Sequence, residues 1–554
     1  MLRPKLYTLL KTKQDRKEFT KKTILREVMA GFVVACIALP LSVALAIASG
    51  VTPERGLITA VVAGFLISAL GGSRVQISGP TAAFVVIIYG IVAQYGVDGL
   101  IAATFMAGII LTAMGFLKFG SFLKYIPYPV VTGFTSGIAV VLFTGQVNDF
   151  LGLGLKDMPA GFFAKWQLYF NSLNLLNPAA LFIGALALCI IIFWPKKIKW
   201  LPAYLAALVV TAAMAQIFKL PAATIESTFG VISAGLPMPK IPVLTLEMIS
   251  SLIRPAFVIA FLAGIESLLS AVVADGMIGK KHRSNMELVA GGIGNIVSSF
   301  FGGLPATGAI ARTAANIDNG GRTPISGMAH GLFLLLMMLC FMRYISMIPM
   351  AALAAILFVV AYKMSSWRSF ADLFKAPVSD IAVLLTTFAL TVVKDLVVAI
   401  EAGLLLAALL FMKRMSDVYR VSKADDDILD EVRHKDDIDL KEITKNVVVY
   451  EINGPFFFGA ANMFVDTLEN LADCKVLVLR MRSVPAMDAT GYHALYKIYK
   501  RCRANNIYMV LSHVQAQPKK TLKKFGFTEQ TDGVYFCKDI DASLQKAKEL
   551  VEVK

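Results

Sequence analysis

Two charged residues, Arg312 and Glu266, each lie in a long apolar stretch of the chain. Glu266 is preceded by Val-Ile-Ala-Phe-Leu-Ala-Gly-Ile, and Arg312 by Leu-Pro-Ala-Thr-Gly-Ala-Ile-Ala. An ionisable side chain within a membrane span is costly and usually marks a functional site. We therefore expect both residues to belong to a functional site, Arg312 as a group that binds an anion and Glu266 as a group that carries a proton or helps to bind Na⁺. A structural ion pair between the two is the alternative interpretation.

Arg312 belongs to one of two apolar segments that glycine and proline interrupt, residues 71–83 and 302–315. Broken backbone is tolerated in lipid only where it is buried in protein or lines a cavity. Two such segments in corresponding halves of a chain indicate a transporter's binding site. If the helices that follow meet end to end, their unpaired N–H groups and positive dipole ends form an anion site. Four hydroxyls would add donors: Ser78, Thr81, Thr307 and Thr313.

The composition places these segments in a membrane protein. Of 554 residues, 57% are hydrophobic and 17% are charged, whereas soluble proteins have about 25% charged residues. From about residue 26 to 412 the chain is a series of apolar runs of roughly 16–23 residues, long enough to cross a bilayer. We count about fourteen spans. The broken segments are each third in a run of seven, which predicts two repeats, the second inverted because seven is odd.

The organisation that we predict has four parts: a basic arm at 1–25, a transmembrane domain at 26–412, a charged linker at 413–439 and a soluble domain at 440–554. The soluble part alternates strand and helix signals, which is typical of a small α/β layer. Its helix at 488–504 begins at Asp488, with Thr490 in the first turn.

The net charge is +16. Basic residues gather in the connections on the side of the N-terminus, which is typical of cytoplasmic loops. We therefore expect a lipid bilayer rather than nucleic acid to be the partner of this charge, and both termini to be cytoplasmic. We find no nucleophile–base pair, no metal-ligating constellation and no glycine-rich phosphate loop, so we expect neither an enzyme nor a bound cofactor beyond a coupling H⁺ or Na⁺.

Four passages of the chain resemble the sulfate permease (SulP) family of anion transporters. Three are in the membrane part: Gln-Ile-Ser-Gly-Pro-Thr-Ala-Ala at 76–83, Gly-Ile-Glu-Ser-Leu-Leu at 264–269, and residues 286–324. The fourth, Met-Asp-Ala-Thr-Gly at 487–491, resembles the STAS domain that closes most chains of the family. One departure is in the first span, where Leu41 and Leu45 stand in place of a glutamine and an aromatic residue.

The resemblance implies seven plus seven inverted spans, a core domain that moves against a gate domain like an elevator, and a cytosolic STAS domain. It also implies a homodimer and a cytosolic partner of the STAS domain. In soluble relatives the residue at the Thr490 position is phosphorylated, so Asp488 and Thr490 are regulatory candidates, although a simple helix-terminal hydroxyl is the alternative. By the resemblance Glu266 takes the place of the acidic residue near the site, and the anion contacts Ser78, Gly79, Pro80, Thr81, Thr307, Gly308, Ala311 and Arg312.

These observations predict a multi-pass protein of the bacterial inner membrane. Its expected function is secondary active transport of a small inorganic anion, sulfate or bicarbonate first, by H⁺ or Na⁺ symport or by anion exchange. The alternatives are transport of a C4-dicarboxylate, transport of a nucleobase by a similar fold, and a passive anion channel or sensor. Arg312 argues against the nucleobase.

Overall fold

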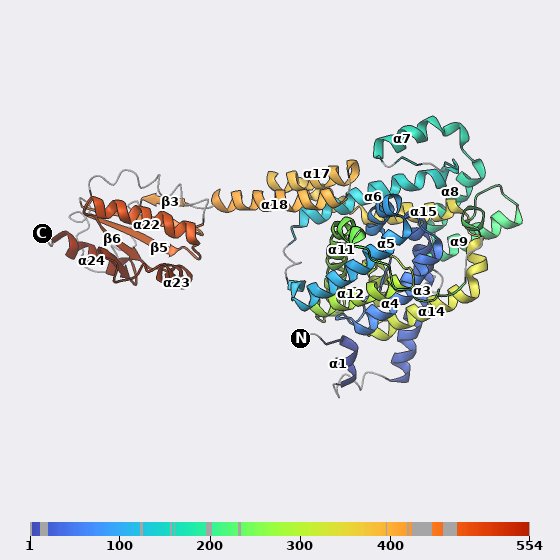
Figure 1. Cartoon of the computed structure of the whole chain (residues 1–554), viewed down its shortest axis with the longest axis horizontal. Helices are drawn as coiled ribbons and strands as arrows, with labels where there is room; N and C mark the ends of the chain where they lie inside the picture. Colours follow the sequence, from blue (N-terminus) through green and yellow to red (C-terminus); the bar gives the residue numbers. More distant parts are fainter. Residues whose placement is uncertain are drawn as a thin grey trace. The chain divides into compact units, whose positions relative to one another are not determined.

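The chain folds into two compact units, Met1–Leu405 and Leu406–Lys554, and each is described by itself. The structure is a computed structural model, and its cartoon is drawn in Figure 1. It describes residues 3–11, 20–121, 126–155, 158–159, 161–195, 202–230, 234–394, 396–417, 420–423, 446–457 and 474–552.

In its described residues the first unit consists mainly of helices. The first half contains α1 (Lys5–Lys11), α3 (Lys21–Ala48), α4 (Pro53–Leu70), α5 (Val85–Phe116), α6 (Tyr128–Leu151), α7 (Phe162–Asn171), α8 (Pro178–Phe193), α9 (Ala203–Ile217) and α10 (Ile225–Phe229). The second half contains α11 (Leu246–Ile278), α12 (Ser284–Phe300), α13 (Ile310–Asp318), α14 (Pro324–Ser346), α15 (Met350–Met364), α16 (Trp367–Asp372), α17 (Val378–Val393) and α18 (Leu396–Asp417), which runs on into the second unit.

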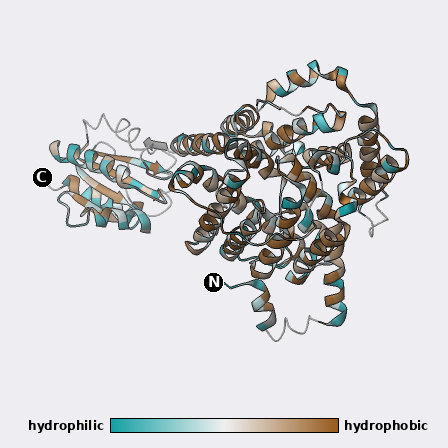
Figure 2. Cartoon of the chain, turned by 45° about the vertical axis from the view of Figure 1, so that its right-hand side comes forward, coloured by the Kyte–Doolittle hydropathy of each residue, from teal (hydrophilic) through white to brown (hydrophobic). Residues whose placement is uncertain are grey.

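Many of these helices are apolar enough to cross a membrane. Within the described residues seven meet both the length and the composition of a span, and α8, α9 and α17 are shorter apolar helices. Figure 2 shows hydrophobic residues over most of the helical unit. The third predicted span, which contains the broken segment 71–83, and the fourth lead into one helix, α5, which bends at Gly96 (φ 68°). The tenth predicted span, which contains the broken segment 302–315, has only the short helix α13. The count of fourteen therefore stays a prediction.

The helices pack in two groups. In the first, α12 packs on α4 and α5, α14 packs on α3 and α4, and α11 packs on α5. In the second, α15 and α17 pack on α6, and α8 packs on α15 and α9. Close approach of α5 and α12 depends on glycine, since a Cβ on Gly108 would lie 2.8 Å from the carbonyl oxygen of Gly292. Small residues of this kind let membrane helices pack closely.

The second unit is a five-stranded sheet with helices. The order is β3 (Arg420–Lys423), β4 (Val447–Asn453), β5 (Val476–Ser483), β6 (Tyr508–Ser512) and β7 (Val534–Cys537). Only the pair β3–β4 is antiparallel. Among the described residues α22 (Ala489–Ala504), α23 (Ala516–Lys524) and α24 (Ile540–Glu552) accompany the sheet. The α/β layer is confirmed.

The predicted charged linker contains a strand. The charged linker at 413–439 contains β3, whose Arg420 faces Asn453 of β4, so part of that linker belongs to the sheet. Pairing with β4 satisfies backbone groups of a strand whose sequence, Arg-Val-Ser-Lys, carries little hydrophobic signal. A helix expected at 460–471 lies outside the described residues.

Candidate functional site

The two broken segments cross each other inside the helical unit. Residues Ser78–Gly79 (β1) and Thr307–Gly308 (β2) form a two-residue antiparallel pair, with Ser78 opposite Gly308 and Gly79 opposite Thr307. All four residues are buried. A backbone interrupted by glycine and proline has no helical partners for its N–H and C=O groups, and pairing across the two segments supplies them. The crossing thus joins residues about 230 positions apart in the sequence.

Each segment leads into a helix that begins beside the crossing. The second segment enters α13 at Ile310, directly after Ala309, whose N–H donates to the carbonyl oxygen of Ile77 at 2.8 Å. The first segment passes through a 3₁₀ turn at Ala82–Phe84 before α5 begins. The first N–H groups of a helix have no intrahelical acceptor and lie at its positive end. Both helix beginnings therefore offer N–H donors near the crossing.

Arg312 lies in the first turn of α13 and is only 3% exposed. Its Nη2 donates to the carbonyl oxygen of Pro80 at 3.2 Å, which connects it to the first segment. Its Nη1 has no hydrogen-bond partner within the described part of the chain. A Cβ on Gly79 would lie 2.8 Å from that Nη1, so the absence of a side chain at position 79 leaves room for the guanidinium.

Glu266 approaches the crossing from the middle of α11 and is partly exposed. The Thr81 hydroxyl donates to its Oε2 at 2.9 Å. No salt bridge joins Glu266 to Arg312 among the residues that the structure describes. The alternative of a structural ion pair between them therefore does not describe this conformation.

Three hydroxyls hold the crossing against α11 and α13. Thr307 Oγ1 donates to the Ala263 carbonyl oxygen at 3.0 Å and lies 2.9 Å from Ser267 Oγ, which accepts from the Gly308 N–H at 3.0 Å. Thr313 Oγ1 accepts from the Ile77 N–H at 3.1 Å. These polar groups of Thr307, Gly308 and Thr313 are thus engaged within the protein.

Access differs among the residues expected to contact an anion. Thr81 and Glu266 are partly exposed and Ala311 is exposed, whereas the others are buried. The accessible part of the site is therefore the region where Thr81, Glu266 and the start of α13 meet. Buried in this conformation are Ser78, Gly79, Pro80, Thr307, Gly308 and Arg312.

Three polar residues near the crossing were missed by the sequence analysis. Ser267 directly follows Glu266, and its hydroxyl oxygen accepts from the N–H of Gly308 in β2. Gln76 lies close to the same glycine, because a Cβ on Gly308 would meet the amide Nε2 of Gln76. His330 of α14 is fully buried, and neither ring nitrogen has a partner within the described residues. Ser267 had a signal in its neighbour Glu266. His330 had none, because it reaches the crossing only through the packing of α14 on α4.

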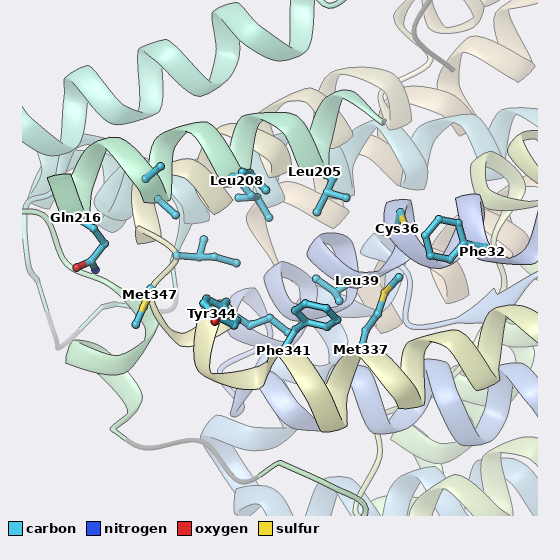
Figure 3. Close-up of a pocket in the computed structure, with 15 residues that line it drawn as sticks. Phe32, Cys36, Leu39, Leu205, Leu208, Gln216, Met337, Phe341, Tyr344 and Met347 are labelled. Atoms are coloured by element: carbon cyan, nitrogen blue, oxygen red, sulfur yellow. The ribbon is translucent and has the colours of Figure 1, made fainter. Parts of the chain in front are cut away.

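A separate cavity of about 620 Å³ lies between α3, α9 and α14. Figure 3 shows its lining, which is almost wholly apolar apart from Gln216 and Tyr344 near one end. Moving an ion into apolar surroundings without partners is very unfavourable. This cavity is therefore not a site for an anion. Its other labelled lining residues are Phe32, Cys36, Leu39, Leu205, Leu208, Met337, Phe341 and Met347.

The regulatory candidates lie at the start of α22 in the second unit. Asp488 is the N-cap, and its carboxylate accepts from the Gly491 N–H at 2.7 Å. Thr490 is exposed in the first turn. The two residues thus have different positions: Asp488 is engaged in capping, while the side chain of Thr490 is accessible.

Known proteins share this architecture. A model of the sulfate permease family matches residues 24–387, and a STAS domain model matches residues 440–547. A Bacillus subtilis protein named "Putative sulfate transporter YvdB" is 40% identical over 94% of this chain and 97% of its own. The bicarbonate transporter BicA of Picosynechococcus is 32% identical over 91% of each chain.

Solved structures agree with the fold. The transmembrane domain of a cyanobacterial BicA matches 70% of this chain and 98% of its own, with 31% identity and a TM-score of 0.62. The murine anion transporter Slc26a9 matches 99% of this chain and 94% of its own at 18% identity, with a TM-score of 0.84, and it supports the fold alone. The chain is an integral, multi-pass membrane protein with a C-terminal STAS domain, and it belongs to the sulfate permease family.

Proposed function

We propose that this protein is a secondary active transporter that moves a small inorganic anion, sulfate or bicarbonate, by H⁺ or Na⁺ symport or by anion exchange. The names of its relatives, which transport sulfate, bicarbonate or other anions, support the anion class. The observation that carries the proposal is Arg312: a buried guanidinium in the first turn of α13 whose Nη1 has no partner among the described residues.

The anion is held by charge and by backbone donors together. Arg312 supplies a fixed positive charge, and the starts of α13 and α5 supply N–H groups and the positive ends of two helix dipoles. Hydrogen bonds to ionised groups are stronger than those between neutral groups. An oxyanion with several acceptor oxygens can use donors from both segments at once, and a ligand without negative charge gains less.

Glu266 is the coupling residue in this proposal. It lies on the accessible side of the crossing and is hydrogen-bonded to Thr81, which belongs to the first segment. A carboxylate there binds H⁺ or Na⁺ and compensates charge within the membrane. Glu266 is on α11 of the first helix group, and α13 with Arg312 packs on α11 and α3 of the same group. The anion and the cation would therefore move together when this group shifts against the second, in an elevator-like cycle.

The test is uptake by purified protein in proteoliposomes. Labelled sulfate, bicarbonate and succinate are each offered with and without an imposed pH or Na⁺ gradient. Accumulation of one inorganic anion driven by one gradient supports the proposal. Downhill flux of every anion, indifferent to both gradients, would instead identify a channel, and selective uptake of succinate would identify a dicarboxylate transporter.

A further inference from the structure

His330 is a buried residue that the proposed mechanism does not use. It lies in the first half of α14 with 0% of its surface exposed, and neither Nδ1 nor Nε2 has a hydrogen-bond partner among the described residues. Buried polar groups are nearly always hydrogen-bonded, since leaving one unpaired costs free energy. A leucine would fill apolar space without that cost. Both ring nitrogens of His330 are therefore able to bind a polar group that is not part of the protein.

His330 lies close enough to Arg312 for the charge of the guanidinium to act on its ring. A Cβ on Gly64 of α4 would lie 3.8 Å from His330 Nδ1 and 2.9 Å from the Ser78 carbonyl oxygen. A Cβ on Gly79 would lie 2.8 Å from Arg312 Nη1 and 3.5 Å from the Cα atom of Ala60. Ala60 and Gly64 are four residues apart in one helix and so share a face. His330 Nδ1 and Arg312 Nη1 thus lie near the same stretch of α4 and β1, the first next to Gly64 and the second next to Gly79.

Sulfate and bicarbonate differ in the hydrogen bonds that they can form with a buried imidazole. Sulfate has only acceptor oxygens, whereas bicarbonate also carries one O–H group. Neutral imidazole has one N–H donor and one acceptor nitrogen. Sulfate cannot satisfy that acceptor, so a buried, neutral His330 beside bound sulfate keeps an unpaired lone pair. A site built to hydrogen-bond a hydroxyl discriminates strongly against an analogue that lacks it.

We propose that His330 is a specificity-determining residue: its unprotonated ring nitrogen accepts a hydrogen bond from the hydroxyl of a protonated oxyanion of the bicarbonate class, while Arg312 pairs with the anion's charged oxygens. This inference rests on the proposed function and narrows its substrate. Glu266 is partly exposed and accepts a hydrogen bond from Thr81, so it remains available for the coupling cation.

The experiment compares selectivity rather than rate. Uptake of labelled bicarbonate and sulfate is measured in proteoliposomes at one pH, and the ratio of the two Vmax/KM values is taken for the unaltered protein, His330→Gln and His330→Leu. We expect the unaltered protein to favour bicarbonate. His330→Gln keeps a donor and an acceptor and should keep the preference. His330→Leu should lower the ratio by about tenfold or more, the scale of one buried hydrogen bond.

Met338→Ala is the matched control. Met338 is fully buried two turns further along α14, so its truncation loosens packing without removing a polar group. It should lower thermal stability and leave the ratio unchanged. Should His330→Leu fail to fold, His330→Met carries the same comparison with His330→Gln.

Three outcomes overturn the inference. Sulfate preferred by the unaltered protein contradicts it directly. A ratio unchanged in His330→Leu, with both uptakes reduced alike, shows a structural role for His330 and leaves the proposed transport function standing. Absence of uptake of either anion by the unaltered protein refutes the proposed function itself, and the two failures are thereby distinguished.

Discussion

The two broken segments share a plan but carry different chemistry. Each contains glycine and proline, contributes a two-residue strand to the crossing, and then begins a helix. The second segment carries the buried charge of Arg312 in a helix of nine residues, α13. The first carries no charge at the crossing itself. Its Thr81 hydroxyl donates to Glu266, and its helix α5 continues for 32 residues through a bend at Gly96.

The two segments therefore contribute different groups. The second segment supplies the fixed positive charge of Arg312, and the first supplies the Thr81 hydroxyl, which contacts the carboxylate of α11. Arg312 is nevertheless held by the first segment, through the Pro80 carbonyl oxygen. The proposed anion site would require both segments, although only the second contains the arginine. Four experiments test this asymmetry.

Removing the charge should have the largest effect. We expect Arg312→Ala to lower anion uptake in proteoliposomes by at least about thirtyfold, since the loss of one member of a buried charge pair costs roughly 2 kcal/mol or more. Arg312→Lys, which keeps the charge and loses the planar donor set, should retain part of the activity. Normal uptake by a folded Arg312→Ala protein would remove Arg312 from the site.

Removing the carboxylate should change coupling more than flux. Glu266→Gln keeps an acceptor for Thr81, so we expect downhill uptake to continue while its dependence on a pH or Na⁺ gradient is lost. Thr81→Val is the matched control, because it removes the hydrogen bond and retains the carboxylate. If Glu266→Gln shows the same gradient dependence as the unaltered protein, the coupling role is wrong.

Adding one methyl group to each segment at the crossing allows a direct comparison of the two segments. In Gly79→Ala the new Cβ would lie 2.8 Å from Arg312 Nη1, and in Gly308→Ala it would lie 2.1 Å from Gln76 Nε2. Each substitution therefore displaces a flexible side-chain end. We expect Gly79→Ala to raise KM for the anion by about tenfold, because small misplacements of a positioning group are costly, and Gly308→Ala to raise it less. Equal KM values would contradict the asymmetry.

Removing the second unit should have the smallest effect on affinity. Deletion of residues 418–554 takes away β3 together with its partner β4, and so leaves no unpaired strand from the sheet. Because domains of this size have their own cores, we expect changes in transport rate, membrane targeting or assembly, with KM within about twofold of the full chain. A much larger change in KM, measured by uptake, would implicate the tail in the anion site.

The sequence analysis predicted most helices and their place in the chain. Apolar runs ended by proline and glycine marked the spans: Pro178 begins α8 and Pro324 begins α14, where the missing N–H of proline costs nothing. The half-helix of the second segment was also predicted, because Gly308 and Arg312 interrupt an otherwise apolar region. Helix α7 was not predicted, since its ten residues are too few to cross a bilayer and lie in a connection between spans.

The residues of the candidate site likewise fall into those that the sequence indicated and those that it did not. Arg312, Glu266 and Thr81 could be selected as candidates because a charge or a hydroxyl in an apolar stretch is conspicuous by itself. Gln76 and His330 carry no such signal, since a single amide or imidazole in a helix or loop has many ordinary roles. Their relation to the crossing depends on how β1, α4 and α14 pack, and no local pattern records that contact.

The sequence by itself determined that this chain spans a membrane, that its helices are broken at two corresponding places, and that a positive and a negative charge lie near them. Those properties follow from residue type and spacing, because the bilayer imposes the same requirements on every segment. Only the tertiary structure decided that Ser78 faces Gly308, that Glu266 accepts a hydrogen bond from Thr81, and that His330 lies next to Gly64 of α4. Such contacts join residues far apart in the chain, and packing between helices alone selects them.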